Sequence, residues 1–489
     1  MTELWQLGLA EAALGLKEHR FSAQELTGAC LKRIEATEPK VRACLSVLSE
    51  SALETAANLD RQGFDDQRPL WGLPLTVKDV FCFKGAPTTA GSKILEGYQP
   101  AFEATVVKRL RQAGAVILAK TNCDEFAMGS STEFSAFKPT HNPWNLGRVP
   151  GGSSGGAAAS IAARQTPGAF GTDTGGSIRQ PAALCGCVGL KPTYGRVSRY
   201  GIVAYASSFD QAGPLARSVS DCGRLLAAVA GHDGRDSTAS SRPVDDYLAL
   251  KPPKPSELVV GLPKELWEAD FDSSVAKVLS EAKNKLAESG MTFRELSLPN
   301  LKYSVATYYI LAAAEASTNL ARYDGVRYGS RSAGADRSGL VEFYTDSRTK
   351  GMGAEVKRRI LLGTFVLSSG YYDAYFRKAA EVRRLIQADY LKALENCHFL
   401  LAPVSSIPAW PFGAFTDDPL TIYQLDMMTL PLNLAGGPGL SLPAGLGPDG
   451  LPVGWQLLGK PFDEAALLSA GLVFERLVPP LPQLPTDCQ

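Results

Sequence analysis

The chain has 489 residues, with 50 lysines and arginines, 50 aspartates and glutamates, and a formal net charge of zero. Hydrophobic residues make up 45% of the sequence, which is ordinary for a globular protein with a large core. A protein that binds DNA or tRNA on its own is normally basic, so this charge balance argues against a free-standing nucleic-acid-binding protein.

Nine cysteines and four histidines are scattered along the chain without metal-ligand spacing. The closest cysteines, Cys185 and Cys187, lack the spacing of a zinc site. The N-terminus has no basic stretch before an apolar core, so we expect no signal peptide, and an odd cysteine count then does not indicate a disulfide framework. We predict buried reduced thiols, no structural zinc and no histidine-based triad.

Residues 1–65 are predicted to be helical. The run from Ser22 to Glu25 has the pattern of a capping box at a helix start. A second helix is expected over about Ser49 to Leu59. This segment is either a layer of the core or a surface for a partner, and the sequence leaves both interpretations open.

Beyond residue 65, short apolar strands alternate with helices, which predicts a single α/β domain over 1–489. We expect a mostly buried central sheet. The predicted strands are Leu75–Val77, Ala115–Ala119, Gly168–Phe170, Val188–Leu190, Leu258–Leu262, Phe399–Pro403, Leu440–Pro443 and Val453–Leu458. The predicted helices are Ala104–Gln112, Ala157–Ala163, Ser274–Ser289, Tyr303–Tyr323, Glu355–Leu367, Tyr372–Glu395 and Asp463–Leu477.

Three other segments are assigned by their composition. The charged, proline-rich stretch from Arg235 to Pro255 and the stretch from Gly329 to Arg337 are predicted to be surface connections. The uncharged run between Asp426 and Asp449 contains several prolines and glycines. A buried strand with turns fits that run better than a membrane helix, so we expect no membrane association.

Two glycine-rich turns each carry a serine. The first reads Gly-Gly-Ser-Ser-Gly-Gly from Gly151, and the second reads Gly-Thr-Asp-Thr-Gly-Gly-Ser-Ile-Arg-Gln-Pro from Gly171. Glycine allows positive φ and close approach of the backbone to a ligand. The turns therefore predict a site that presents Ser153 and Ser177 among backbone N–H groups. A flexible linker is the alternative, but a helical run and a short strand lie between the turns.

These motifs closely resemble the amidase signature family, whose members use a Ser–cis-Ser–Lys triad. The resemblance implies the α/β amidase-signature fold, a mixed central sheet flanked by helices on both faces. The resemblance implies that Ser177 is the nucleophile, that Ser153 relays the proton after a cis Gly152–Ser153 bond, and that Lys78 is the base. Lys78 follows a short apolar strand, where a lysine would otherwise be expected to point to solvent. Ser154 is the competing candidate for the relay.

Amide hydrolysis also needs an oxyanion hole and a base in the neutral state. The backbone N–H groups of the second glycine turn are predicted to bind the oxyanion, namely those of Thr174, Gly175, Gly176 and Ser177. A lysine base requires a pKa about 3 units below its usual value near 10.4, which burial can supply. Asp173 and Arg179 are interpreted as supports of the turn, with substrate orientation as the alternative.

Several further stretches narrow the resemblance to the A-subunit family of the aminoacyl-tRNA amidotransferases. They lie at 125–133, 191–201, 322–329, 355–364 and 368–375, and the likeness runs from about residue 5 to 478. That family implies glutamine hydrolysis in this chain and transfer of the ammonia to a kinase/amidotransferase B subunit. The B subunit uses ATP and Mg to amidate misacylated Glu-tRNA(Gln) or Asp-tRNA(Asn), and a small C subunit braces the heterotrimer. The resemblance implies a cytoplasmic protein with no cofactor or metal of its own and with tRNA contacted mainly through the partner.

Glutamine requires a cation for its α-carboxylate and an anion for its α-ammonium group. The resemblance places these at Arg359 and Asp426, with Tyr308 nearby and the carbonyl of Met128 in the pocket. Arg358 is adjacent and remains an alternative to Arg359.

Two other functions stay open at this point. A free-standing amidase acting on acylamides would not need Arg359 and Asp426. A noncatalytic scaffold would tolerate the loss of Lys78, Ser153 or Ser177, and all three are present. The sequence does not distinguish Glu-tRNA from Asp-tRNA as acceptor, nor a bacterial from an organellar protein.

Overall fold

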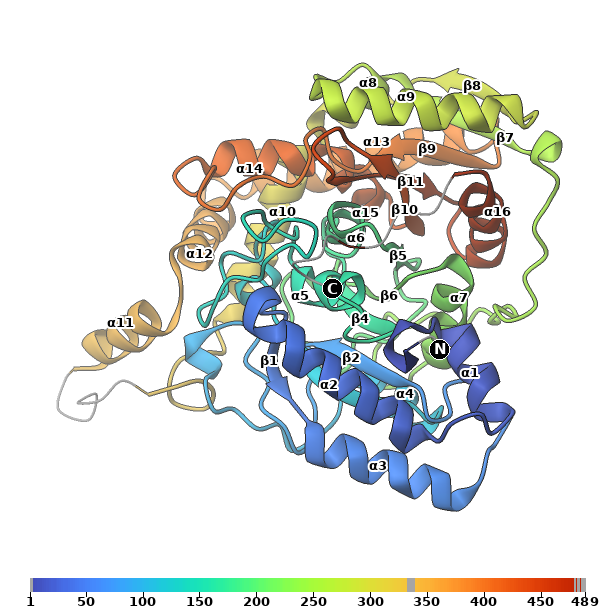
Figure 1. The fold of residues 1–489 in the computed structure, drawn as a ribbon. Coiled ribbons are helices and arrows are strands. Elements are labelled where there is room, and N and C mark those ends of the chain that lie inside the picture. Colours follow the sequence, from blue (N-terminus) through green and yellow to red (C-terminus); the bar gives the residue numbers. More distant parts are fainter. Residues whose placement is uncertain (1–2, 332–338, 479–480, 482–483, 485–489) are drawn as a thin grey trace.

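A central sheet organises the computed structural model, which describes residues 3–331, 339–478, 481 and 484. Within these residues the sheet has eleven strands in the order β1-β3-β2-β4-β6-β5-β10-β11-β9-β7-β8 (Figure 1). Their bounds are β1 Cys44–Val47, β2 Pro74–Lys78, β3 Val116–Thr121, β4 Gly168–Thr172, β5 Val188–Lys191, β6 Ala212–Ala216, β7 Val259–Pro263, β8 Thr292–Leu296, β9 Phe399–Pro403, β10 Gly439–Leu446 and β11 Pro452–Leu458.

The sheet is mixed. Strand β2 pairs in parallel with β3 and β4, and β7 pairs in parallel with β8 and β9. The central strands β6, β5, β10 and β11 pair antiparallel with their neighbours. The parallel part around β2 matters for the site, because the carboxyl ends of β2 and β4 lie at one edge of the sheet.

Helices cover both faces of the sheet, as predicted. Alternate residues of a strand face opposite sides. In β4, Ala169 packs in a small cluster with Ala157 and Ala182, whereas its neighbour Phe170 belongs to the main core. The helices are α1 Leu9–Lys17, α2 Ala23–Val41, α3 Ser49–Gln62, α4 Thr105–Gln112, α5 Gly155–Ala162, α6 Arg179–Cys185, α7 Val219–Val229, α8 Lys264–Trp267, α9 Ser273–Glu288, α10 Ser304–Leu320, α11 Leu340–Gly351, α12 Ala354–Leu367, α13 Lys378–Ala393, α14 Pro419–Leu425, α15 Leu430–Ala435 and α16 Glu464–Leu477.

The N-terminal segment departs from the prediction at one point. The capping box at Ser22 is present, with the Glu25 N–H donating to Ser22 Oγ over 3.0 Å. However, residues 44–47 form the edge strand β1 rather than helix, because they pair antiparallel with β3. The Glu38 carboxylate accepts the N–H groups of Ala43 and Cys44 and so holds the chain at the turn into the strand.

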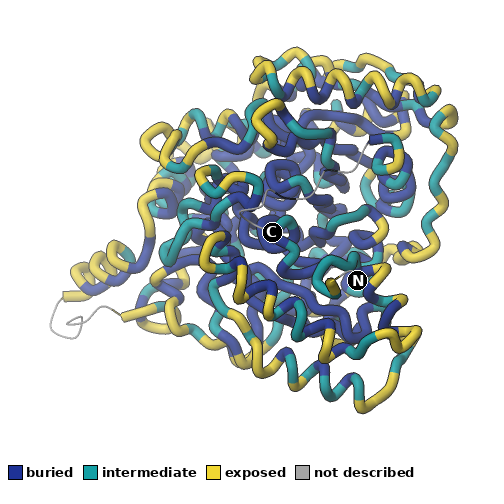
Figure 2. Tube along the Cα trace, in the orientation of Figure 1, coloured by how far each residue is buried: buried dark blue, intermediate teal, exposed yellow. Residues whose placement is uncertain are grey.

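The other segments follow the prediction in part. Residues 235–255 form an irregular, largely exposed connection (Figure 2). Much of the predicted connection at 329–337 lies outside the described residues. Between Asp426 and Asp449 the buried strand β10 is present, but the short helix α15 precedes it.

The described residues contain eight cysteines, which are all free and buried, and Cys488 lies outside them. In the same part of the chain no helix is both long and apolar enough to cross a membrane. Nor does this part hold a group of three or more His, Cys, Asp or Glu residues that could bind a metal ion.

Candidate active site

The predicted catalytic residues meet at the carboxyl ends of β2 and β4. Lys78 is the last residue of β2, and Thr172 is the last residue of its parallel neighbour β4. The first glycine turn precedes α5, and the second joins β4 to α6. The N–H of Ser154 donates to the carbonyl of Ser177 over 3.1 Å, which joins the two turns directly.

Lys78 is fully buried and points at hydroxyl groups. Its Nζ lies 2.7 Å from Ser153 Oγ, 3.0 Å from Ser154 Oγ and 3.0 Å from Thr172 Oγ1. No carboxylate of the described residues pairs with this amine, in contrast to Lys120, which forms a buried ion pair with Asp79. Burial lowers the pKa of Lys78 to about 8, although Cys123 and nearby aspartates oppose the shift. About one-tenth of the amine is therefore neutral at pH 7.

The hydrogen bonds of the paired serines distinguish their roles. Ser154 Oγ donates to the Thr172 carbonyl over 3.1 Å and accepts the Thr172 N–H over 3.2 Å. Its proton is thus held by the backbone. Ser153 Oγ is bonded to Lys78 Nζ and to no other partner in the described part of the chain, so its proton is free to move. The Gly152–Ser153 peptide bond is cis, as the resemblance implied.

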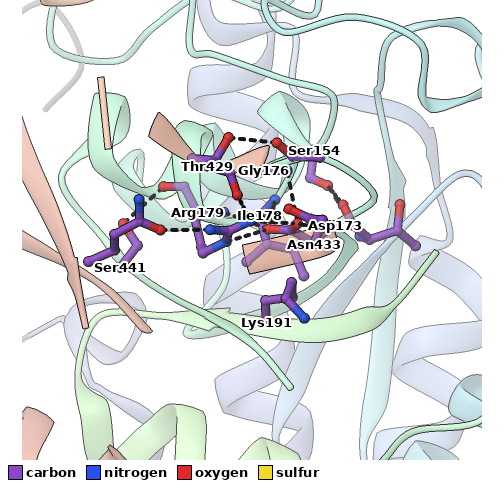
Figure 3. Close-up of polar contacts among 12 residues, drawn as sticks. Ser154, Asp173, Gly176, Ile178, Arg179, Lys191, Thr429, Asn433 and Ser441 are labelled. Carbon is purple, nitrogen blue, oxygen red and sulfur yellow. Dashed lines mark hydrogen bonds and ion pairs between the residues drawn. The ribbon is translucent and has the colours of Figure 1, made fainter. Parts of the chain in front are cut away.

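A buried ion pair supports the turn that carries Ser177. Arg179 Nε lies 3.0 Å from Asp173 Oδ2, and both side chains are completely buried (Figure 3). The same guanidinium donates to Gln456 and to Asn433, each over 2.6 Å. Although burial alone would raise it, the Arg179 charge brings the pKa of Asp173 down to about 2. This network agrees with the interpretation of both residues as supports of the turn.

One N–H group that was predicted for the oxyanion hole has an acceptor within the protein. The N–H of Gly176 donates to Asp173 Oδ1 over 2.9 Å (Figure 3), because this carboxylate folds back under the turn. Gly176 is therefore committed to the turn rather than free for substrate. The N–H groups of Thr174, Gly175 and Ser177 have no acceptor among the described residues, and Asp210 fixes the Thr174 side chain over 2.7 Å. A side chain at Gly175 would come within 2.7 Å of Tyr308, so glycine keeps this face open.

A small pocket lies between the turn that carries Ser177 and the two predicted ligands of the amino acid, Arg359 and Asp426. Arg359 lines it from α12 and is 3% exposed, whereas the Arg358 side chain is 46% exposed. The structure thus separates the two arginines that the sequence left as alternatives. The lining residues are Ala127, Gly129, Ser130, Gly152, Gly175, Gly176, Ser177, Tyr308, Tyr309, Arg359 and Asp426. Met128 lies between two of them with its side chain in the core, and its carbonyl contact stays a prediction.

Asp426 lies at the cavity wall with partners that sequence reasoning missed. Its Oδ2 accepts the hydroxyl of Tyr309 over 2.7 Å, and its Oδ1 accepts that of Ser130 over 2.7 Å. Burial raises the pKa of Asp426 to about 6, and these two hydrogen bonds oppose the rise. The only sequence signals for these partners were that Tyr309 follows Tyr308 and that Ser130 lies within the stretch 125–133, which carries part of the resemblance.

A buried lysine faces a pair of serines, and a third serine lies on a turn with free N–H groups. This arrangement is suited to amide hydrolysis, and the chain belongs to the amidase family. The model of that family matches residues 25–468.

Two close relatives make the assignment more specific, and both are A subunits of a glutamyl-tRNA(Gln) amidotransferase. The chain is 57% identical over 481 residues to the one from Oleidesulfovibrio alaskensis, and the match covers 98% of both chains. It is 54% identical over 484 residues to the one from Nitratidesulfovibrio vulgaris, covering 98% of this chain and 99% of the relative.

Solved structures agree in fold. The A subunit of the glutamyl-tRNA(Gln) amidotransferase from Thermotoga maritima superposes with a TM-score of 0.83 at 40% identity and 99% coverage of each chain. A peptide amidase from Stenotrophomonas maltophilia gives a TM-score of 0.84 at 30% identity, again over 99% of each chain. The predicted amidase-signature fold is confirmed.

Proposed function

We propose that this chain is the glutamine-hydrolysing subunit of a tRNA-dependent amidotransferase. The observation that carries the proposal is the cavity itself, which places a buried cation, Arg359, and a buried anion, Asp426, in the same small space as Ser177. A simple amide has no groups that would use this charge pair. The likeness to amidotransferase A subunits over nearly the whole chain supports the same function.

In the proposed mechanism neutral Lys78 takes the proton of Ser153, and Ser153 takes that of Ser177. The Ser177 oxygen attacks the side-chain amide carbon of glutamine, and the free turn amides stabilise the oxyanion. The proton returns through Ser153 to the leaving nitrogen as the C–N bond breaks, which releases ammonia and leaves a glutamyl ester on Ser177. Water then cleaves the ester by the same proton path and gives glutamate.

The remaining assignments belong to the same proposal. Arg359 binds the α-carboxylate, Asp426 binds the α-ammonium group, and Tyr308 and the Met128 carbonyl complete the pocket. The ammonia passes to a B subunit that uses ATP and Mg to amidate misacylated Glu-tRNA(Gln) or Asp-tRNA(Asn), and a small C subunit completes a cytoplasmic heterotrimer. Residues 1–489 act as one domain, and the zero net charge fits tRNA binding mainly by the partner.

Replacing Asp426 tests the amino-acid site. We expect Asp426→Asn to raise the KM for glutamine at least about 10-fold with a smaller change in kcat, because a neutral amide cannot pair with the α-ammonium group. The measurement is ammonia release against glutamine concentration in the complex that contains this chain.

The exposed carboxylate of Asp417 offers a matched control, because Asp417→Asn changes charge on the surface before α14. An unchanged KM in Asp426→Asn would mean that the ammonium site is elsewhere. Equal hydrolysis of glutamine and butyramide by the wild-type chain would favour a free-standing amidase.

A further inference from the structure

The carboxylate of Glu355 is the hub of a buried network behind Arg359. Glu355 is 6% exposed, and its Oε1 accepts both Arg359 Nε and the Tyr423 hydroxyl, each over 2.7 Å. Its Oε2 accepts a bond from Arg358. Burial opposes ionisation of Glu355, but Arg359 and the Tyr423 hydroxyl bring its pKa below the usual value. Glu355 is therefore an ionised partner of Arg359 at neutral pH.

The guanidinium of Arg359 is fixed on all sides but one. Nε is bonded to Glu355, and one Nη donates to the Tyr205 hydroxyl over 2.7 Å. The rings of Tyr205, Tyr309 and Tyr423 lie 5.5, 5.1 and 5.4 Å from its central carbon. The second Nη has no acceptor among the described residues. A carboxylate in the cavity can therefore meet this cation at a single, defined nitrogen.

A tyrosine stack connects this network to Asp426. The rings of Tyr309 and Tyr423 stack with centroids 3.9 Å apart and planes at 25°. The Tyr309 hydroxyl donates to Asp426, and the Tyr423 hydroxyl donates to Glu355. The stack therefore ties α10, α12 and α14 together and sets the spacing between the cation and the anion of the cavity.

We propose that Glu355 and Tyr423 are positioning residues that act through Arg359 and select amides bearing an α-carboxylate. Tyr309 is a positioning residue that acts through Asp426 and selects amides bearing an α-ammonium group. This inference rests on the proposed function, because it assigns the two ends of the cavity to the two charges of glutamine. None of the three touches the reacting atoms, so they govern substrate choice rather than the chemical step.

Four amides distinguish recognition of the α-carboxylate from recognition of the α-ammonium group. Glutamine has both charged groups, glutaramate lacks the ammonium group, γ-aminobutyramide lacks the carboxylate, and butyramide lacks both. We expect Tyr423→Phe and Glu355→Gln to lower kcat/KM roughly 10-fold for glutamine and glutaramate, since each loses a hydrogen bond to a charged group. For the two amides without a carboxylate, kcat/KM stays at the wild-type value. Tyr309→Phe shows the complementary pattern, with losses for glutamine and γ-aminobutyramide only.

The phenylalanine variants keep both rings, so the stack and the fold are preserved, and the melting temperature of each complex verifies this. Tyr303→Phe is the matched control, because Tyr303 is 46% exposed just before α10. All assays use the complex that contains this chain. If the wild type prefers glutamine and the variants lose activity equally on all four amides, the network is only structural and this inference is wrong. If the wild type itself shows no preference for glutamine, the proposed function fails instead.

Discussion

We expect Ser177→Ala to lower kcat for glutamine hydrolysis at least about 10⁴-fold, because removing the nucleophile of a serine hydrolase leaves only binding and oxyanion stabilisation. Ser177 is 8% exposed and lines the same cavity as Arg359 and Asp426, so it is placed to meet a bound amide. The alanine fits without strain, since only a hydroxyl is removed. The measurement is ammonia release from glutamine by the complex.

Ammonium salts provide the control for this variant. Amidation of misacylated tRNA driven by added ammonium should continue at the wild-type rate, because that step belongs to the B subunit in the proposed division of labour. Loss of both reactions to the same extent would contradict that division. Retention of glutamine hydrolysis would remove Ser177 from the nucleophile role.

We expect Lys78→Met to lower kcat for glutamine hydrolysis by about 10²- to 10⁴-fold, the usual contribution of a general base. Methionine has a similar length and no charge, so the variant removes proton transfer while it fills the buried site. The wild-type pH profile gives a second measurement. Protonation disables a lysine base, so kcat/KM should rise with pH up to about 8, the pKa of Lys78, and level off above it.

Lys84→Met is the matched control, because Lys84 is exposed six residues further along the chain. It should keep the activity and the pH profile of the wild type. A Lys78→Met variant that is fully active, or a wild-type profile that is flat across about pH 6 to 9, would show that another group takes the proton.

It was predictable that the candidate catalytic residues lie together, because short motifs carry them. The two glycine turns and the lysine after Val77 are local features, and the structure brings Lys78 within 2.7 Å of Ser153 Oγ. The long periodic helices were also predictable. The capping box formed by Ser22 and Glu25, for example, is a helix-start signal that depends only on residues close together in sequence.

Features that depend on distant contacts were not predictable. Strand β6 contains Gly213 and Pro214, which are poor strand residues, and it exists because β4 and β5 pair with it on both sides. Strand β8 is a largely exposed edge strand, and it was missed because it depends on parallel pairing with β7. Ser130 bonds to Asp426 across 296 positions of sequence, a contact that no local spacing reveals.

The Gly176 difference has a comparable origin. The sequence of the turn shows that Gly176 has a backbone N–H. It does not show that this N–H donates to the Asp173 carboxylate. Likewise, adjacent arginines look alike in sequence, and only the packing of α12 buries Arg359 and exposes Arg358.

The most direct test of the proposed function is ammonia release from glutamine by the complex co-purified with this chain, with and without ATP and misacylated Glu-tRNA or Asp-tRNA. We predict that release rises when ATP and the misacylated tRNA are both present, and that the ammonia appears as amide on the tRNA. Release that is indifferent to both additions, or faster from simple amides than from glutamine, would contradict the proposed function.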